Sequence, residues 1–221
     1  MIIKFQTFLQ NYKIWNNEKF ILEDKNYYYF WKKPWLASSW WEKTSILDSI
    51  KNWEILQVQK ETFTEKEEYW LLNRLDNDTS WFVYFAKNMK IKDKYKKLQK
   101  ENQVNKIYYA VVNWKFLYDN TIISYPIMHK NKSKMVAIIN EKDKKKWRWK
   151  QLFVKTKIKK ISYNKQLNLS YLEVCISKWV RHQIRIHLSS IWFPIIWDNL
   201  YWWKENKILC LFSVWFNLKN S

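Results

Sequence analysis

One stretch of the chain places nine mostly polar residues directly before an apolar run. It reads Asn73-Arg74-Leu75-Asp76-Asn77-Asp78-Thr79-Ser80-Trp81, and residues 82–86 follow as Phe-Val-Tyr-Phe-Ala. Aromatic and β-branched residues favour a strand over 82–86, whereas Asp, Asn, Thr and Ser favour a loop before it. Loops held by a rigid strand often carry catalytic groups, so Asp76 is a candidate. A plain polar turn is the alternative, and this stretch alone does not decide between the two.

The charge of the chain favours a polyanionic partner. Its 221 residues carry a formal net charge of +20, which is typical of proteins that bind nucleic acid or an anionic membrane surface. Arg makes planar, directional contacts, whereas Lys supplies a diffuse field. Three of the four Arg fall in the two most motif-like stretches, 73–81 and 179–188. The four are Arg74, Arg148, Arg181 and Arg185.

Several classes of protein are disfavoured by what the sequence lacks. No apolar run approaches the roughly 20 residues that span a bilayer, and the start of the chain has no signal-peptide pattern. Two Cys are too few for a disulfide framework. No Cys/His cluster has the spacing of a metal site. We therefore expect a cytoplasmic protein that binds no membrane and no metal. We also expect it to be a monomer and to need no cofactor.

The glycine content is abnormal, because the sequence contains no Gly and 17 Trp. Gly normally makes up about 7% of residues, so its absence by chance has a probability on the order of 10⁻⁷. Several Trp stand in apparent loops where Gly is expected, as in Trp40-Trp41 and Trp202-Trp203. One hypothesis is that UGA codons, which some bacterial lineages read as Gly, have been written as Trp. The alternative is a protein that is truly rich in Trp and free of Gly.

The pattern of apolar residues predicts a mixture of strands and helices in one domain, residues 1–221. Alternation and β-propensity predict strands, and 3.6-residue periodicity predicts helices. The Lys-Pro loop covers 32–39, the segment 141–150 is expected to be a basic hairpin tip, and His129 is expected in a loop. The expected strands are 27–30, 82–86, 107–112, 121–126, 152–161, 167–176 and 208–216. The expected helices are 44–60, 89–103 and 180–188.

Taken in order, these stretches resemble the motifs of the RluA-type pseudouridine synthases. The family motif His-Arg-Leu-Asp-x-x-Thr-Ser-Gly is similar to 73–81, with Asn73 in place of His. Lys-x-Tyr-x-Ala-x-Val-x-Gly is similar to 106–114, and Gly-Arg-Thr-His-Gln-Ile-Arg-Val-His-Leu to 179–188. Ile-Gly-His-Pro-Ile-x-Gly-Asp resembles 191–198, Leu-Tyr-Gly-Gly resembles 200–203, and an early Lys-Pro matches 33–34. The family glycines fall on Trp81, Trp114, Trp179, Trp192, Trp197, Trp202 and Trp203.

The resemblance covers nearly the whole chain and implies a fold and an activity. The implied fold is α+β, with a mixed, mostly antiparallel central sheet flanked by helices and an active-site cleft across the sheet. It corresponds to the catalytic domain alone, without the extra N-terminal RNA-binding domain of some members. Family members isomerise uridines in rRNA or tRNA without a cofactor. The resemblance assigns Asp76 as nucleophile or base, Tyr108 as the group stacked on the flipped uracil, and Arg185 as the ionic partner of Asp76.

The resemblance also implies RNA contacts, by Arg74, Lys33, Arg181, His182 and Gln183. The chain departs from the family pattern at Asn73, at Val180 in place of Arg, at Arg181 in place of Thr, and at Phe193 in place of His. A non-catalytic RNA-binding or RNA-folding factor with the same fold is therefore the competing hypothesis. A basic protein bound to a membrane surface is a third, but no strongly amphipathic helix is evident.

Overall fold

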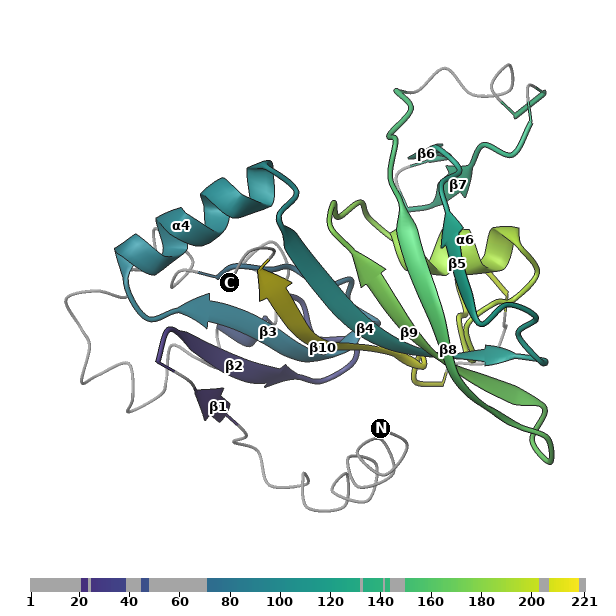
Figure 1. Cartoon of the computed structure of the whole chain (residues 1–221), viewed down its shortest axis with the longest axis horizontal. Helices are drawn as coiled ribbons and strands as arrows, with labels where there is room; N and C mark the ends of the chain where they lie inside the picture. Colours follow the sequence, from purple (N-terminus) through teal and green to yellow (C-terminus); the bar gives the residue numbers. More distant parts are fainter. Residues whose placement is uncertain are drawn as a thin grey trace. The chain divides into compact units, whose positions relative to one another are not determined.

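The computed structural model describes residues 21–23, 25–38, 45–47, 71–131, 133–140, 142–143, 150–202 and 207–218 (Figure 1). The chain forms two compact units, Met1–Lys97 and Leu98–Ser221. Within the described residues, no helix is long and apolar enough to cross a membrane. The expectation of a single domain stays a prediction.

The first unit contains three antiparallel strands in the order β1-β2-β3. They are β1 (Ile21–Glu23), β2 (Tyr27–Lys32) and β3 (Ser80–Ala86). All seven residues of β3 are buried, as its continuous apolar sequence predicts. Register is set by aromatic packing, because the ring of Tyr29 meets those of Phe82 and Tyr84 edge-on. The predicted strands 27–30 and 82–86 are confirmed.

Helix α4 (Met89–Lys100) confirms the helix predicted over 89–103. Asn88 caps it, since its side-chain oxygen accepts a hydrogen bond from the backbone N–H of Ile91 at 3.0 Å. Tyr95 is fully buried, whereas most Lys of the helix are exposed. The helix therefore presents a basic surface.

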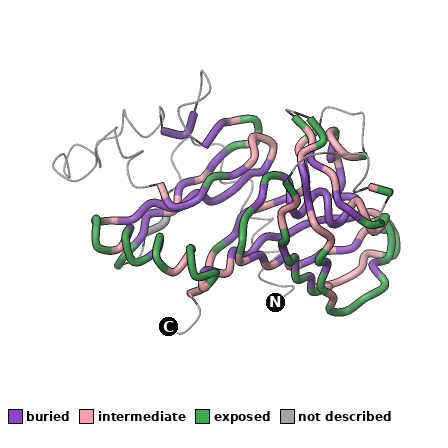
Figure 2. Tube along the Cα trace, turned by 90° about the horizontal axis from the view of Figure 1, so that it is seen from above, coloured by how far each residue is buried: buried purple, intermediate pink, exposed green. Residues whose placement is uncertain are grey.

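The second unit contains a five-stranded sheet in the order β10-β4-β9-β8-β5 and a separate β6–β7 hairpin. Each pairing inside this unit is antiparallel among the described strands. The alternating sequence of β9 buries every second residue. Figure 2 shows the buried residues along the strands and the exposed ones gathered at turns and along a helix. The strands are β4 (Val104–Asn113), β5 (Asn120–Ile123), β6 (Ile127–His129), β7 (Met135–Ala137), β8 (Thr156–Asn164), β9 (Leu169–Ile176) and β10 (Leu211–Leu218).

Helix α6 (Gln183–Ser190) packs against β7 and β8. Ile186 projects from it into a small apolar cluster with Ile127, Met135, Val154 and Val180. Six of its eight residues are buried, so its side chains are fixed by packing. This rigidity matters because α6 carries Arg185.

The predicted α+β fold with a mostly antiparallel sheet is confirmed, including the pairing of 152–161 with 167–176 as β8 and β9. The strand predicted over 121–126 ends at Ile123, ahead of Pro126, which has no N–H to donate. His129 ends β6, so its placement in a loop was wrong. The predicted helix 44–60 and hairpin tip 141–150 lie largely outside the described residues.

Candidate functional site

In the first unit, the backbone around Asp76 is fixed by hydrogen bonds on both sides. The Ser38 hydroxyl accepts a bond from the backbone N–H of Leu75 at 3.0 Å and donates to the Leu75 carbonyl at 3.1 Å. The N–H of Thr79 donates to the Asp76 carbonyl at 3.0 Å and closes the turn. Asp76 itself is half-buried. The backbone that carries the Asp76 side chain is therefore fixed in place.

The far side of this loop is held by residues at the end of β2 and just after it. The Asn77 carbonyl accepts bonds from the backbone N–H of Trp35 at 2.7 Å and from the Lys32 ammonium at 2.8 Å. Lys32 is fully buried, whereas its neighbour Lys33 is exposed. Sequence reasoning singled out Lys33 and missed Lys32. Arg74 is exposed beside Asp76, as an RNA contact requires.

Asn73, which replaces the family His, ties the loop to β3. Its side-chain oxygen accepts the backbone N–H of Tyr84 at 2.7 Å, and its amide donates to the Phe82 carbonyl at 3.5 Å. The side chain is 3% exposed. An amide offers both a donor and an acceptor, so Asn73 can bond to two backbone groups of β3 at once. The residue that departs from the family pattern therefore helps to hold the loop.

The backbone adopts left-handed conformations at several Trp. Left-handed φ is uncommon outside Gly and strained for a bulky residue. The described part of the chain has nine Trp, at 31, 35, 81, 114, 179, 192, 197, 202 and 215. Five of these nine have positive φ: Trp35 (62°), Trp81 (81°), Trp114 (67°), Trp192 (66°) and Trp197 (58°).

In the second unit, Tyr108 lies in β4, opposite Val174 of β9 and Ser213 of β10. It is 3% exposed. Lys106 lies two residues earlier and therefore on the same face of the strand. Burial lowers the pKa of Lys106 to about 8. This face of β4 combines an aromatic ring with an amine whose pKa lies well below that of an exposed Lys.

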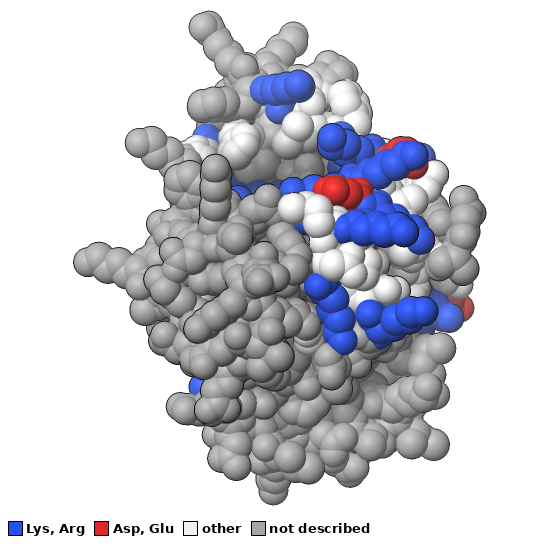
Figure 3. All heavy atoms as spheres, turned by 90° about the vertical axis from the view of Figure 1, so that its left-hand side faces the viewer, with Lys and Arg blue, Asp and Glu red and all other residues white. Residues whose placement is uncertain are grey.

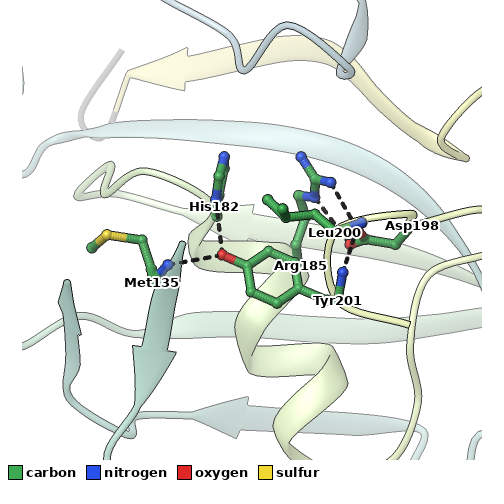
Figure 4. A network of polar contacts seen from close by, with 6 residues as sticks. All are labelled: Met135, His182, Arg185, Asp198, Leu200 and Tyr201. Atoms are coloured by element: carbon green, nitrogen blue, oxygen red, sulfur yellow. Dashed lines mark hydrogen bonds and ion pairs between the residues drawn. The ribbon is translucent and has the colours of Figure 1, made fainter. Parts of the chain in front are cut away.

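Arg185 forms a bidentate ion pair with Asp198 (Figure 4). Its Nε donates to one carboxylate oxygen at 3.0 Å and its Nη2 donates to the other at 2.7 Å. Both side chains are 1% exposed. The backbone N–H groups of Leu200 and Tyr201 donate to the same carboxylate, each at 3.2 Å. The charge of Arg185 is therefore buried and paired.

Tyr201 joins this pair to the start of α6. Its hydroxyl accepts the backbone N–H of Met135 at 3.1 Å and lies 2.8 Å from Nδ1 of His182. The guanidinium of Arg185 lies over the Tyr201 ring, 5.5 Å from its centre. Burial, together with the charges of Arg185 and Arg181, lowers the pKa of His182 to about 3. His182 is therefore neutral at neutral pH.

Gln183 joins α6 to β8. Its amide nitrogen donates to the Lys155 carbonyl and to the Thr156 hydroxyl, both at 3.1 Å, and its oxygen accepts the N–H of Val180 at 3.1 Å. Of the three RNA contacts expected here, Arg181 is exposed, whereas His182 and Gln183 are buried.

The structure thus divides the expected site residues between the units. Asp76, Arg74 and Lys33 belong to the first, and Tyr108 and Arg181–Arg185 to the second. Sequence reasoning gave no role to Asp198 or Tyr201. The sequence did contain a signal for them, because Asp198 lies in the motif-like stretch 191–198 and Tyr201 in 200–203.

Comparison with known proteins identifies the family. Residues 28–190 match the family model described as RNA pseudouridylate synthase. An uncharacterized RNA pseudouridine synthase of Helicobacter pylori is 30% identical over 182 residues, which are 82% of this chain and 62% of that protein. An uncharacterized RNA pseudouridine synthase of Mycoplasma genitalium is 30% identical over 142 residues, 64% of this chain and 44% of that protein.

The matched residues therefore cover 44% and 62% of the lengths of these two relatives. A solved structure, human RNA Pseudouridylate Synthase Domain Containing 4, has the same fold, with a TM-score of 0.65 and 19% identity over 97% of this chain and 88% of that one. The family match covers most of the chain, including Asp76, Tyr108 and Arg185. The chain belongs to the RNA pseudouridylate synthase family.

Proposed function

We propose that this protein is an RNA pseudouridine synthase that isomerises specific uridines in rRNA or tRNA. The observation that carries the proposal is the Asp76 loop, whose backbone is bonded on both sides while Asp76 itself is half-buried. An acidic residue on a fixed backbone and within reach of solvent suits a group that must meet a flipped nucleotide. A single catalytic domain, a monomeric state and a cytoplasmic location stay predictions.

The reaction breaks the glycosidic bond, turns the uracil and rejoins it to the ribose through carbon. Asp76 acts as the nucleophile or as a base at the sugar. Tyr108 stacks on the flipped uracil and handles the proton at its ring carbon. Arg185 is the proposed cation that keeps Asp76 ionised. The buried positions of Tyr108 and Arg185 support these roles, because exclusion of water strengthens electrostatic contacts.

Exposed basic residues are the proposed RNA contacts. Extruding a uridine costs a few kcal/mol, and contacts to the backbone offset this cost. Arg74, Lys33 and Arg181 are exposed and suit this task. Figure 3 shows Lys and Arg outnumbering acidic residues among the described residues of one face. The exposed Lys of α4 are Lys90, Lys94, Lys96, Lys97 and Lys100.

Replacing Asp76 by Asn tests the activity. We expect pseudouridine in treated RNA to fall to background, with RNA affinity within about twofold of the parent. Asp78→Asn, in the same loop and equally half-buried, is the matched control and should keep the activity. Equal yields from parent and Asp76→Asn would refute the catalytic proposal and favour the RNA-binding factor.

Replacing three Lys of α4 by Gln tests the RNA surface. Neutralising Lys90, Lys94 and Lys97 should weaken binding to all sequences alike. It should also lower the slope of log affinity against log salt by about 2 to 3, since each lost phosphate contact reduces it by about 0.7 to 0.9. An unchanged slope would place the RNA elsewhere. Three Lys→Gln changes give a control of equal charge, at Lys155 next to β8 and at Lys157 and Lys159 within it.

We infer that the cell inserts Gly where this sequence has Trp at left-handed positions. Four of the five left-handed Trp, at 81, 114, 192 and 197, also fall on glycines of the resembled motifs. At such angles a steric clash of the Cβ atom destabilises an ordinary residue by about 1–2 kcal/mol, whereas Gly has no Cβ and no such clash. Two independent observations, motif position and φ, therefore support the same substitution.

Peptide mass spectrometry of the protein from its native cell tests this inference. Gly at position 81 is the expected result, and the form with Gly is then the one to assay. Trp at position 81 would refute the inference and leave a bulky ring next to the Asp76 loop. UGG codons at these positions would refute it as well.

A further inference from the structure

We propose that Asp198 is a positioning residue that sets the orientation of the Arg185 guanidinium for the reaction. The inference rests on the proposed function and assigns a role that the sequence motifs left open. Its first support is the bidentate contact, because two parallel N–H···O bonds fix the plane of a guanidinium as well as its place.

Asp198 is itself held in place by the backbone. Besides the two N–H groups that bind its carboxylate, its carbonyl accepts the N–H of Trp202 at 2.9 Å and its own N–H donates to Ile195 at 3.2 Å. The carboxylate therefore sits at the centre of a tight turn. A group with so many fixed bonds can orient a partner with little loss of entropy.

The turn is tied to the strand that carries Tyr108. The backbone N–H of Ile196 donates to the Val111 carbonyl at 2.9 Å, and Ile195 forms a β-bridge with Val112. Asp198 thus couples the guanidinium on α6 to β4. The two candidate groups of this unit, Tyr108 and Arg185, are held on one framework.

Tyr201 holds Arg185 from a second direction. Its ring faces the guanidinium, and its hydroxyl is bonded to the Met135 backbone and to His182. The ring therefore cannot swing away without breaking these bonds. Figure 4 shows the guanidinium bonded to Asp198, with the Tyr201 ring beside it.

The pairing changes what Arg185 contributes. Asp198 offsets the charge of Arg185 at long range, so the effect of Arg185 on a substrate or on Asp76 depends on where its N–H groups point at close range. A guanidinium has five N–H donors, and Asp198 engages two of them. Direction matters here because an error of about 1 Å in a catalytic contact can cost about 100-fold in rate.

The test replaces Asp198 by Asn in the full chain, in the form that mass spectrometry finds. Asn keeps the shape and one oxygen for the two backbone N–H groups, but it loses the charge and the second acceptor for Arg185. We expect kcat to fall at least tenfold while RNA affinity stays within about twofold. The matched control is Asp119→Asn, which breaks the ion pair between Asp119 and Lys160. The side chain of Asp119 is 84% exposed, and this variant should leave kcat unchanged.

A second readout follows Arg185 directly. The four Arg of the chain make ¹⁵N-arginine spectra simple to assign. The parent should show an Arg185 Nε–H that exchanges slowly with water, and Asp198→Asn should lose this protection. A purely structural role would lower stability without changing kcat of the folded enzyme.

Each result decides the proposal. Parent-like kcat or an unchanged Arg185 signal in Asp198→Asn overturns it while the proposed function stands. A parent that forms no pseudouridine overturns the proposed function, and this inference with it. If Asp198→Asn does not fold, Asp198→Glu replaces it. Glu keeps the charge but moves the carboxylate by one methylene, so a lower kcat supports positioning and a parent-like kcat overturns it.

Discussion

The two halves of the set of candidate residues, one half in each unit, are stabilised in different ways. The Asp76 loop is held by side chains that bond to backbone, namely the neutral Ser38 and Asn73 and the Lys32 ammonium, and Asp76 itself is half-buried. At the start of α6, the functional group is itself buried and is held by a countercharge, Asp198. The first half therefore fixes a backbone, and the second fixes a side chain.

This difference predicts where each half is vulnerable. A loop fixed by several separate hydrogen bonds to backbone should lose only about 1 kcal/mol for each neutral bond removed. A buried ion pair should fail sharply when one partner is lost, because the other is left charged in an apolar place. The following variants test this contrast, from the largest expected effect to the smallest.

Replacing Arg185 by Met should give the largest loss of stability. It leaves the Asp198 carboxylate buried without its cation, and we expect unfolding free energy to fall by about 3–5 kcal/mol. Urea unfolding measures the change. Lys160→Met removes a cation from the exposed pair with Asp119 and should cost less than about 1 kcal/mol. Similar losses in both variants would contradict the contrast.

The α6 end should also be sensitive to acid. The pKa of His182 is lowered to about 3 in the folded protein, from 6.5, so protons bind more tightly to the unfolded chain. The contribution of neutral His182 to the free energy of unfolding is therefore fully present above pH 6.5 and is lost as the pH drops toward 3. At pH 4.5 this loss should be about 2–3 kcal/mol. His182→Gln should flatten this slope, measured by urea unfolding at several pH values. His129→Gln is the control, and equal slopes in both variants would show that His182 is not responsible.

Replacing Asn73 by Ala tests the loop half. The backbone N–H of Tyr84 loses its partner, and we expect a loss of about 1–2 kcal/mol in unfolding free energy. Arg74→Ala, one residue along and exposed, should stay within about 0.5 kcal/mol of the parent. If Asn73→Ala is as stable as Arg74→Ala, the hydrogen bond does not hold the loop.

The smallest effect should be a gain. Trp192 follows α6, is 71% exposed and has a φ of 66°, so Gly removes strain and little buried surface. Thermal unfolding should show Trp192→Gly more stable by about 0.5–1 kcal/mol. Trp215→Gly, in β10 and outside the left-handed positions, should be less stable than the parent. A loss at both positions would remove this support for Gly at 192.

Much of the fold could be predicted because it depends on local pattern. Alternation in 167–176 set the face of β9, and the polar residues before 82–86 marked the Asp76 loop. The predicted ends of elements were wrong where a single backbone angle or a missing backbone N–H decides where the element begins or ends. Helix α6 begins at Gln183 instead of 180 because His182 has a left-handed φ of 55°. The strand over 121–126 stops before Pro126.

The sequence by itself determined the family, the basic surface and the identity of Asp76, Tyr108 and Arg185 as candidates, since these follow from residue types at fixed spacing. Only the tertiary structure decided what holds them. Asp198 lies 13 residues from Arg185, and Ser38 lies 37 residues from Leu75. Contacts at such separations depend on how packed elements meet, and no periodicity within one element encodes them. For this reason the motifs indicated the candidate groups, and the fold revealed the residues that hold the Asp76 loop and Arg185 in place.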